Sequence, residues 1–496
     1  MKKYLSMICC LGALLTAGCS DDKTGEEEGP TGEAKITAFG FKAENNPDYL
    51  VKDYTGTISG TAISVKVPAD TDLSALVATF ETADGESTVT VNGTTQVSGT
   101  TANDFSDPVD YLVSLGKKNA LYTVTVSELP EAVWTKVTEW EQTVNDFRLE
   151  IDPTDGQPAL VVNADGTTSA EDVAIFAKVS NGKFQPDTVA ARRTSMPAFG
   201  FSASGKPYIF YYDPVSSVAK GFIATRTGTS WTEECTDIDR PTTVGPTIGS
   251  VGERMFAFTM NRTAGVLGER FVNITEYNNG WNKNQSIAGR TSGRAYSVIA
   301  RNVGNAMYVL VHNPAETASN TPHSVSIYKF ENNMWSTIIE AYVKPNEAGD
   351  SYVPIDLTNH DLAVDKDGNI YLGISYNLTP QVVKFDSSSK DFNLVATVFP
   401  KWHSRANYCR VAVSPIGILY VAYKDADNHL FATSLDNKTK DWKTAVQLST
   451  EAVDGFEFKF AENGTAYLAY NVDAEKVEGE IVSPAKIHLY KLATAE

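Results

Sequence analysis

Apolar and polar residues alternate with a period of two along most of the chain, in short runs separated by glycine or polar turns. Clear examples are residues 62–67 (AISVKV) and 88–91 (TVTV). Alternation of this kind is typical of β-strands that bury one face and expose the other to solvent. The pattern therefore predicts an all-β protein.

The first group of such strands covers residues 34–128, with turn signals at Asp84-Gly85 and Asn92-Gly93. Short alternating strands separated by such turns predict a β-sandwich. The closing segment, residues 111–126, is similar to the last hairpin of the Ig-like domains that open many Bacteroidetes surface lipoproteins. That resemblance implies a small Ig-like β-sandwich that holds the following domain away from a membrane.

From residue 132 to residue 496, one pattern recurs seven times: a glycine turn is followed by a short apolar strand that ends in Asn or Asp. The seven units are 156–163, 205–213, 252–261, 304–313, 368–377, 417–425 and 464–471. The glycines lie 47 to 64 residues apart, which is the spacing of four-stranded propeller blades. The spacing predicts a seven-bladed β-propeller; an eighth unit has room only in the long interval before Gly368.

An aromatic residue opens the expected fourth strand of six units: Phe184, Trp231, Trp281, Trp335, Phe392 and Trp442. The last unit has no room for a fourth strand of its own before the chain ends. Trp134-Thr135-Lys136-Val137, at the start of the region, matches the segments at Trp231 and Trp442. We therefore expect this N-terminal strand to pair into the last blade and close the propeller.

The first 33 residues read as a targeting segment rather than as part of a fold. Lys2 and Lys3 precede an apolar run that is too short to span a membrane, and small residues then lead to Cys19. The segment resembles a lipoprotein signal peptide over residues 1–18, with Cys19 as the lipidated residue; ordinary secretion is the alternative. Residues 19–33 form an acidic, flexible tether that resembles the surface-export signal of Bacteroidetes lipoproteins. The resemblance implies an outer-membrane lipoprotein that faces the medium and meets the membrane only through its lipid.

Charge and composition narrow the classes of partner. The 61 acidic residues outnumber the 42 basic residues, which argues against nucleic acid as a ligand. With six His and five Cys, the chain has no pattern typical of a metal site or of a disulfide framework, and no cofactor is expected. Cys235 and Cys409 lie in different units and are expected to be buried thiols. Asp365-Lys366-Asp367-Gly368 is interpreted as a hairpin turn rather than a calcium loop.

Binding chemistry is expected at one mouth of the propeller, where the loops that enter the seven innermost strands converge. Against the acidic background, these loops carry Arg, His, Tyr and Trp side chains, which can bind carboxylates or sulfates and stack on sugar rings. The candidate ligand-binding residues are Arg193, Arg294, Tyr296, His360, Trp402, His403, Arg405 and Tyr408.

The interpretation favours a surface protein whose propeller binds a polysaccharide or oligosaccharide, with an anionic one suited to the arginines. The alternative is a polysaccharide lyase or glycosidase in which Arg405 neutralises a carboxylate and His360, His403 or Tyr408 transfers the proton. Trp231 and Trp281 resemble the Trp end of sialidase Asp-boxes, but the Ser-x-Asp part is missing. A scaffold that docks other surface proteins is the third possibility.

Overall fold

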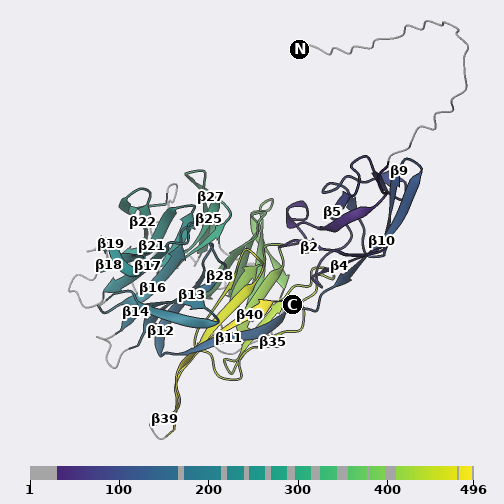
Figure 1. Ribbon diagram of the computed structural model, residues 1–496. Helices are drawn as coiled ribbons and strands as arrows, with labels where there is room; N and C mark the ends of the chain where they lie inside the picture. Colours follow the sequence, from purple (N-terminus) through teal and green to yellow (C-terminus); the bar gives the residue numbers. More distant parts are fainter. Residues whose placement is uncertain are drawn as a thin grey trace, which may run out of the picture.

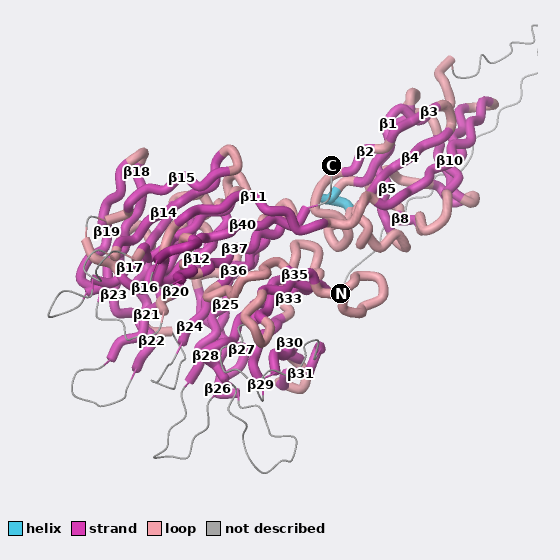
Figure 2. Tube along the Cα trace, turned by 90° about the horizontal axis from the view of Figure 1, so that it is seen from below, coloured by secondary structure: helices cyan, strands magenta, loops and turns pink. Residues whose placement is uncertain are grey.

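The computed structural model describes residues 31–165, 172–190, 192–213, 220–238, 245–262, 270–287, 297–313, 324–342, 356–376, 379–396, 409–477 and 480–493. These residues form an all-β protein, as predicted, whose one helical element in the described ranges is the single-turn 3₁₀ helix η1 (Ala43–Asn45). None of the helical structure described is long and apolar enough to cross a membrane. Figures 1 and 2 show a smaller N-terminal group of strands beside a larger group.

The N-terminal group consists of two sheets that share one apolar core. The first sheet has the order β2-β1-β5-β8 and the second β3-β4-β10-β9-β6-β7. The bounds are β1 (Ile36–Phe41), β2 (Tyr54–Thr55), β3 (Thr57–Ser59), β4 (Ala62–Val67), β5 (Leu76–Thr82), β6 (Thr88–Val91), β7 (Thr94–Thr95), β8 (Ala102–Asn103), β9 (Val109–Leu115) and β10 (Lys118–Glu128). Phe39, Phe105 and Tyr111 pack in its centre, with Phe39 and Tyr111 edge to face at 5.3 Å. The alternating residues of β4 and β9 supply this core, as their pattern predicted.

The larger group contains seven four-stranded antiparallel sheets, numbered here in chain order. Sheet 1 consists of β12 (Val144–Ile151), β13 (Pro158–Ala164), β14 (Val173–Ser180) and β15 (Lys183–Thr188). Sheet 2 consists of β16 (Ser195–Phe201), β17 (Pro207–Asp213), β18 (Lys220–Thr227) and β19 (Ser230–Ile238). Sheet 3 consists of β20 (Thr247–Val251), β21 (Arg254–Arg262), β22 (Arg270–Tyr277) and β23 (Trp281–Gln285). Sheet 4 consists of β24 (Ser297–Val303), β25 (Ala306–Asn313), β26 (Ser324–Glu331) and β27 (Met334–Tyr342). Sheet 5 consists of β28 (Asp356–Val364), β29 (Ile370–Tyr376), β30 (Thr379–Asp386) and β31 (Asp391–Ala396). Sheet 6 consists of β32 (Cys409–Val413), β33 (Leu419–Lys424), β34 (Leu430–Ser434) and β35 (Val446–Gln447). Sheet 7 combines β36 (Phe456–Phe460), β37 (Ala466–Val472) and β40 (Lys486–Ala493) with β11 (Val133–Glu141).

The first strands of these sheets lie next to one another in chain order. β12 contacts β16, β16 contacts β20, and so on to β36, which in turn contacts β12. Each of the seven repeat glycines has a positive φ, from 54° at Gly304 to 87° at Gly417. A residue with a side chain is strained there, so glycine suits the turn between the first two strands of every sheet. The fold is therefore β-propeller-like, and the repeat read from the sequence corresponds to its sheets.

The N-terminal strand of the large group pairs with its C-terminal strand. β11 runs antiparallel to β40, with Trp134 opposite Leu492 and Glu141 opposite Lys486. Trp134 packs on Phe458 of β36, at 5.8 Å between ring centroids. Sheet 7 thus gains its fourth strand from the start of the region, as the match at Trp134 predicted.

The aromatic residues that open the fourth strands connect neighbouring sheets. Trp231 packs on Phe176 of sheet 1, with ring centroids 5.3 Å apart, and Trp281 packs on Tyr208 of sheet 2 at 6.1 Å. Trp335 contacts Phe258 of sheet 3 in the same way, at 6.3 Å. Each of these rings therefore fills the space between its own sheet and the preceding one.

Ion pairs link the N-terminal group to the turns of sheets 5 and 6. Lys366 pairs with Asp48, Lys438 with Glu128, and Lys443 with both Asp70 and Glu131. Figure 1 shows this group next to the green and yellow strands, on the side away from the teal strands of sheets 2 and 3.

His488 of β40 is expected to make the stability of sheet 7 sensitive to acid. Its side chain is buried, neither ring nitrogen has a hydrogen-bond partner among the described residues, and Glu139 lies 3.7 Å from Nδ1. Burial lowers the pKa of His488 below its ordinary 6.5, and Lys136 lowers it further, although Glu139 opposes them. Because the unfolded chain then binds a proton that the folded chain does not, the contribution of His488 to stability is constant above about pH 7.5 and falls as the pH drops through 6.5.

The variant His488→Phe keeps a ring against Tyr470 and removes the titrating group. Urea midpoints measured at pH 7.5 and pH 5.5 should therefore differ less in this variant than in the unmodified chain. An equal difference in both proteins would show that His488 contributes nothing to acid sensitivity.

Candidate functional site

The centre of the large group is a narrow channel lined by the first strands of all seven sheets. A cavity of about 190 Å³ lies there between strands β12, β16, β20, β24, β28, β32 and β36. Its charged lining residues are Arg148, Glu150, Arg301, Asp361, Arg410, Glu457 and Lys459. They alternate with apolar residues along their strands, so the charged side chains face the channel while the apolar ones pack between sheets.

The cations of the channel are paired with carboxylates. Arg148 Nη1 lies 2.6 Å from Asp146, Lys459 Nζ lies 2.8 Å from Glu150, and Arg410 lies 3.7 Å from Glu457. Arg301 pairs with Asp361 of the neighbouring sheet and also donates to the carbonyl oxygens of Ala300 and Leu362, both at 3.0 Å. The pairs of Lys459, Arg410 and Arg301 connect the inner strands of different sheets, whereas Arg148 and Asp146 both lie in β12.

The carboxylates of the channel keep its arginines charged. Burial alone would lower the pKa of Arg148, but Asp146 and Glu457 more than offset this effect and raise the pKa above its usual range. Arg301 behaves in the same way, with Asp361 as its strongest partner. An incoming anion would therefore have to displace a carboxylate from a half-buried guanidinium, which is costly.

A second cavity of about 190 Å³ opens next to the channel, where the loops enter β12 and β36. It is lined by Asn145, Asp146, Arg148, Arg410, Asp454, Glu457 and Asn471, among others. In this part of the mouth, carboxylates outnumber guanidinium groups. The arginines of the entry loops suggested an anionic ligand, but the residues that line this cavity carry no net positive charge.

The Asn residues that end the second strands hold the entry loops of the mouth. The Asn163 side-chain oxygen accepts from the Thr194 hydroxyl at 2.9 Å, and the Asn471 oxygen accepts from the Gly455 backbone N–H at 2.8 Å. Both partners directly precede an innermost strand. The recurring Asn of the sequence repeat thus has a structural role at these two positions.

The candidate residues predicted from the sequence are described only in part. Arg193 lies in the loop before β16, partly buried, and its buried Nε has no hydrogen-bond partner among the described residues. His360 lies within β28, next to Asp361, but its side chain is outside the described atoms. Six of the predicted residues lie outside the described residues altogether: Arg294, Tyr296, Trp402, His403, Arg405 and Tyr408. Cys19, the expected lipidation site, also lies outside them.

Arg192, the neighbour of Arg193, is held by sheet 2. Its guanidinium lies 3.1 Å from Glu233 and 3.6 Å from Asp213, and it stacks over Phe222 at 4.4 Å. Of the two arginines in this loop, Arg192 is therefore engaged by carboxylates of its own sheet.

Sequence reasoning missed the charged channel, although a signal was present. Residues 147–151 (FRLEI) and 456–460 (FEFKF) place charged residues at every second position of strands whose other residues are apolar. In a strand buried on both sides, such residues have to face a polar channel or one another.

The expectation of two buried thiols is confirmed: Cys235 and Cys409 are free and buried, and burial raises their pKa values to about 11 and about 12.

In the described ranges, one group of side chains has ligand atoms close enough to hold a metal ion: Asp425, Asp427 and His429, all within 4.8 Å of one another. Asp425 already accepts from the backbone N–H groups of Asp427 and His429, at 2.9 and 2.7 Å. At the other acidic turn, Asp365 accepts from the backbone N–H groups of Asp367 and Asn369. Both arrangements are those of hydrogen-bonded turns.

Comparisons with known proteins give one sequence match and several distant structural ones. A family model described as "SGBP, N-terminal" matches residues 47–126. No curated protein matches the chain. A DUF4623 family protein from Bacteroides eggerthii is 10% identical, with 93% of this chain and 99% of that one covered and a TM-score of 0.34.

Two further solved structures are fungal. An α-L-arabinanase from Penicillium chrysogenum, complexed with arabinobiose, is 10% identical, with 61% of this chain and 94% of that one covered and a TM-score of 0.38. An α-L-arabinofuranosidase from Fusarium graminearum is 9% identical, with coverages of 59% and 92% and a TM-score of 0.36. At these TM-scores, the likeness assigns no activity to the chain.

Proposed function

We propose that this chain is a cell-surface glycan-binding protein of Bacteroidetes type. The match to the N-terminal domain of surface glycan-binding proteins over residues 47–126 is the observation that carries the proposal. The matched residues are strands and turns of the small two-sheet group, which leaves the larger group as the ligand-binding part.

The proposed organisation follows the order of the chain. Residues 1–18 are a lipoprotein signal peptide, Cys19 carries the lipid, and residues 19–33 form the tether at the outer surface. Residues 34–128 form an Ig-like spacer, and residues 132–496 a seven-bladed propeller closed by its N-terminal strand. The pairing of β11 with β40 and the contact of β36 with β12 support this reading of the propeller.

The mouth of the propeller is the proposed principal site. We assign to it Arg193, whose Nε has no partner among the described residues, and the entry loops that carry Arg294, Tyr296, His360, Trp402, His403, Arg405 and Tyr408. Planar guanidinium groups and aromatic rings at the end of a channel can grip a sugar chain by hydrogen bonds and stacking. Because the described wall of the mouth is not basic, we place no requirement on the charge of the glycan.

Affinity electrophoresis of the purified chain in gels with neutral or acidic polysaccharides tests the proposal. We expect retardation by at least one polysaccharide, weakened about tenfold or more in the combined variant Arg294→Ala with Arg405→Ala, since hydrogen bonds to charged groups are lost. Arg192→Ala, whose guanidinium is held by Glu233, is the matched control and should bind like the unmodified chain. Retardation by none of the polysaccharides would contradict the proposed function.

The same incubations show whether the chain cleaves what it binds. New reducing or unsaturated ends, absent in the arginine variant, would assign a glycosidase or lyase instead of a binding protein.

A further inference from the structure

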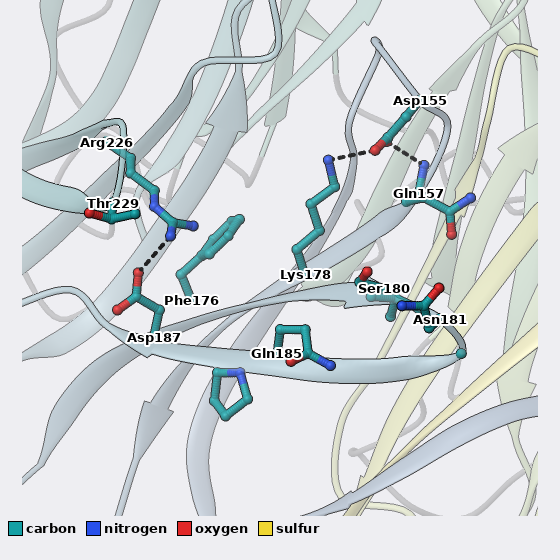
Figure 3. Close-up of a pocket in the computed structure, with 13 residues that line it drawn as sticks. Asp155, Gln157, Phe176, Lys178, Ser180, Asn181, Gln185, Asp187, Arg226 and Thr229 are labelled. Atoms are coloured by element: carbon teal, nitrogen blue, oxygen red, sulfur yellow. Dashed lines mark hydrogen bonds and ion pairs between the residues drawn. The ribbon is translucent and has the colours of Figure 1, made fainter.

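A groove of about 820 Å³ lies away from the channel, between sheets 1 and 2 (Figure 3). Its floor comes from β14 and β15, where Phe176 stands opposite Asp187 and Lys178 opposite Gln185. Because directly opposed residues of an antiparallel pair point to the same face, these four side chains share the face turned toward sheet 2. Arg226 and Thr229 of sheet 2 form the other wall.

The charges of the groove neutralise one another in two separate groups. At one end, Lys178 Nζ lies 2.8 Å from Asp155 and also pairs with Asp152 beneath it. Burial alone would lower the pKa of Lys178, but these carboxylates raise it, so the amine stays charged and paired. At the other end, Asp187 lies 3.4 Å from Arg226 and accepts from Trp231 Nε1 at 2.9 Å. Figure 3 shows the Phe176 ring between the two groups.

The uncharged polar side chains of the groove, in contrast, are available for hydrogen bonds to a ligand. The side chains of Gln157, Gln185, Asn181, Ser180 and Thr229 are exposed, line the groove and make no hydrogen bond to the described residues. Side-chain amides offer two donors and one acceptor oxygen in a plane, and hydroxyl groups act as both donor and acceptor. Fixed ion pairs such as Asp187 with Arg226 present an acceptor beside a donor. Such an array suits adjacent hydroxyl groups of a sugar.

A charged ligand fits the groove poorly. An anion would compete with Asp155 or Asp187 for its cation, and a cation would compete with Lys178 or Arg226, so either one would break an existing pair. The volume lies in the range of small-ligand sites, and the exposed rim lets a longer chain continue across the surface.

We infer that this groove binds an uncharged segment of a glycan chain, as a second site in addition to the mouth. The inference rests on the proposed function for the class of ligand. The proposed groove site differs from the proposed mouth site in its position, in the amide side chains that bind the ligand, and in its preference for an uncharged sugar.

The test compares two double variants of the purified chain against gels of neutral polysaccharides (a β-glucan, a galactomannan, an arabinan) and acidic ones (a polygalacturonate, a chondroitin sulfate). Gln157→Ala with Gln185→Ala removes both amides from the groove. Gln285→Ala with Gln447→Ala removes two exposed amides from the fourth strands of sheets 3 and 6, outside the groove. Thermal midpoints of all proteins establish that they fold alike.

We expect the groove variant to lose at least about fivefold in affinity for a neutral polysaccharide, the effect of two lost hydrogen bonds, and the control variant to keep its affinity. A groove variant that binds every neutral polysaccharide as tightly as the unmodified chain overturns the inference. Binding only to acidic polysaccharides also overturns it, but leaves the proposed function in place. Binding to no polysaccharide overturns both.

Discussion

Replacing Arg301 by methionine is expected to lower the free energy of unfolding by about 3–5 kcal/mol, the cost of breaking a buried ion pair by removing one partner. The variant leaves the Asp361 side chain, of which 4% is exposed, with the backbone N–H groups of Leu362 and Val411 as its hydrogen-bond donors among the described residues. It also removes the donors to the carbonyl oxygens of Ala300 and Leu362. Urea unfolding followed by circular dichroism and tryptophan fluorescence measures the change.

Arg192→Met is the matched control, because this arginine also pairs with two carboxylates but leaves 39% of its side chain exposed. Its loss should cost at most about 1 kcal/mol, as is usual for exposed pairs. Combining Arg301→Met with Asp361→Asn removes the orphaned charge and keeps an acceptor oxygen, so part of the stability should return. If Arg301→Met costs no more than Arg192→Met, the channel pairs do not hold the sheets together.

Deleting residues 133–141 is expected to abolish the folded monomer. The deletion removes β11, uncovers the edge of β40 and exposes Ile487 and Leu489, which are fully buried. An open edge beside apolar side chains is a template for aggregation. Size-exclusion chromatography should therefore show loss of the monomer peak, and circular dichroism should show loss of the cooperative thermal transition.

Deleting residues 475–483 is the control of equal length. They contain β38 (Glu475–Val477) and β39 (Glu480–Ser483), a separate two-stranded sheet that projects from the molecule in Figure 1. Four residues then still connect β37 to β40, enough for a hairpin. This variant should remain monomeric with a nearly unchanged thermal midpoint. A monomeric, cooperatively melting chain without 133–141 would show that the remaining sheets close without β11.

The strands and their connections followed from local signals in the sequence. Each glycine of the repeat serves a turn with positive φ, and the Trp134 segment matches fourth strands elsewhere because it occupies the same place in a sheet. Such features depend on residues a few positions apart, so one sequence is enough to read them.

The candidate binding sites could not be predicted from local signals in the sequence. Lys178 pairs with Asp152, 26 residues earlier in the same sheet, and Arg301 pairs with Asp361, 60 residues later in the next sheet, so the choice of partner depends on how strands and sheets are arranged in space. The groove between sheets 1 and 2 has no motif, since its side chains come from three stretches of the chain, residues 155–157, 176–187 and 226–229. The arginines of the entry loops suggested a basic mouth, but Arg410 is balanced by Glu457 of a strand distant in the sequence, and Arg148 by Asp146 of its own strand.

The double role of Lys443 has a mechanical consequence. If the chain is anchored at its N-terminus and bound to a polymer, drag on that polymer pulls on the linker that leads directly into β11, the strand that pairs with the C-terminal strand β40. Lys443 holds Asp70 of the N-terminal group and Glu131 of that linker, and Lys438 holds Glu128 beside it. Under such a load, the N-terminal group would share the tension with the linker through these partly exposed ion pairs, which would be strained before the hydrogen bonds between β11 and β40.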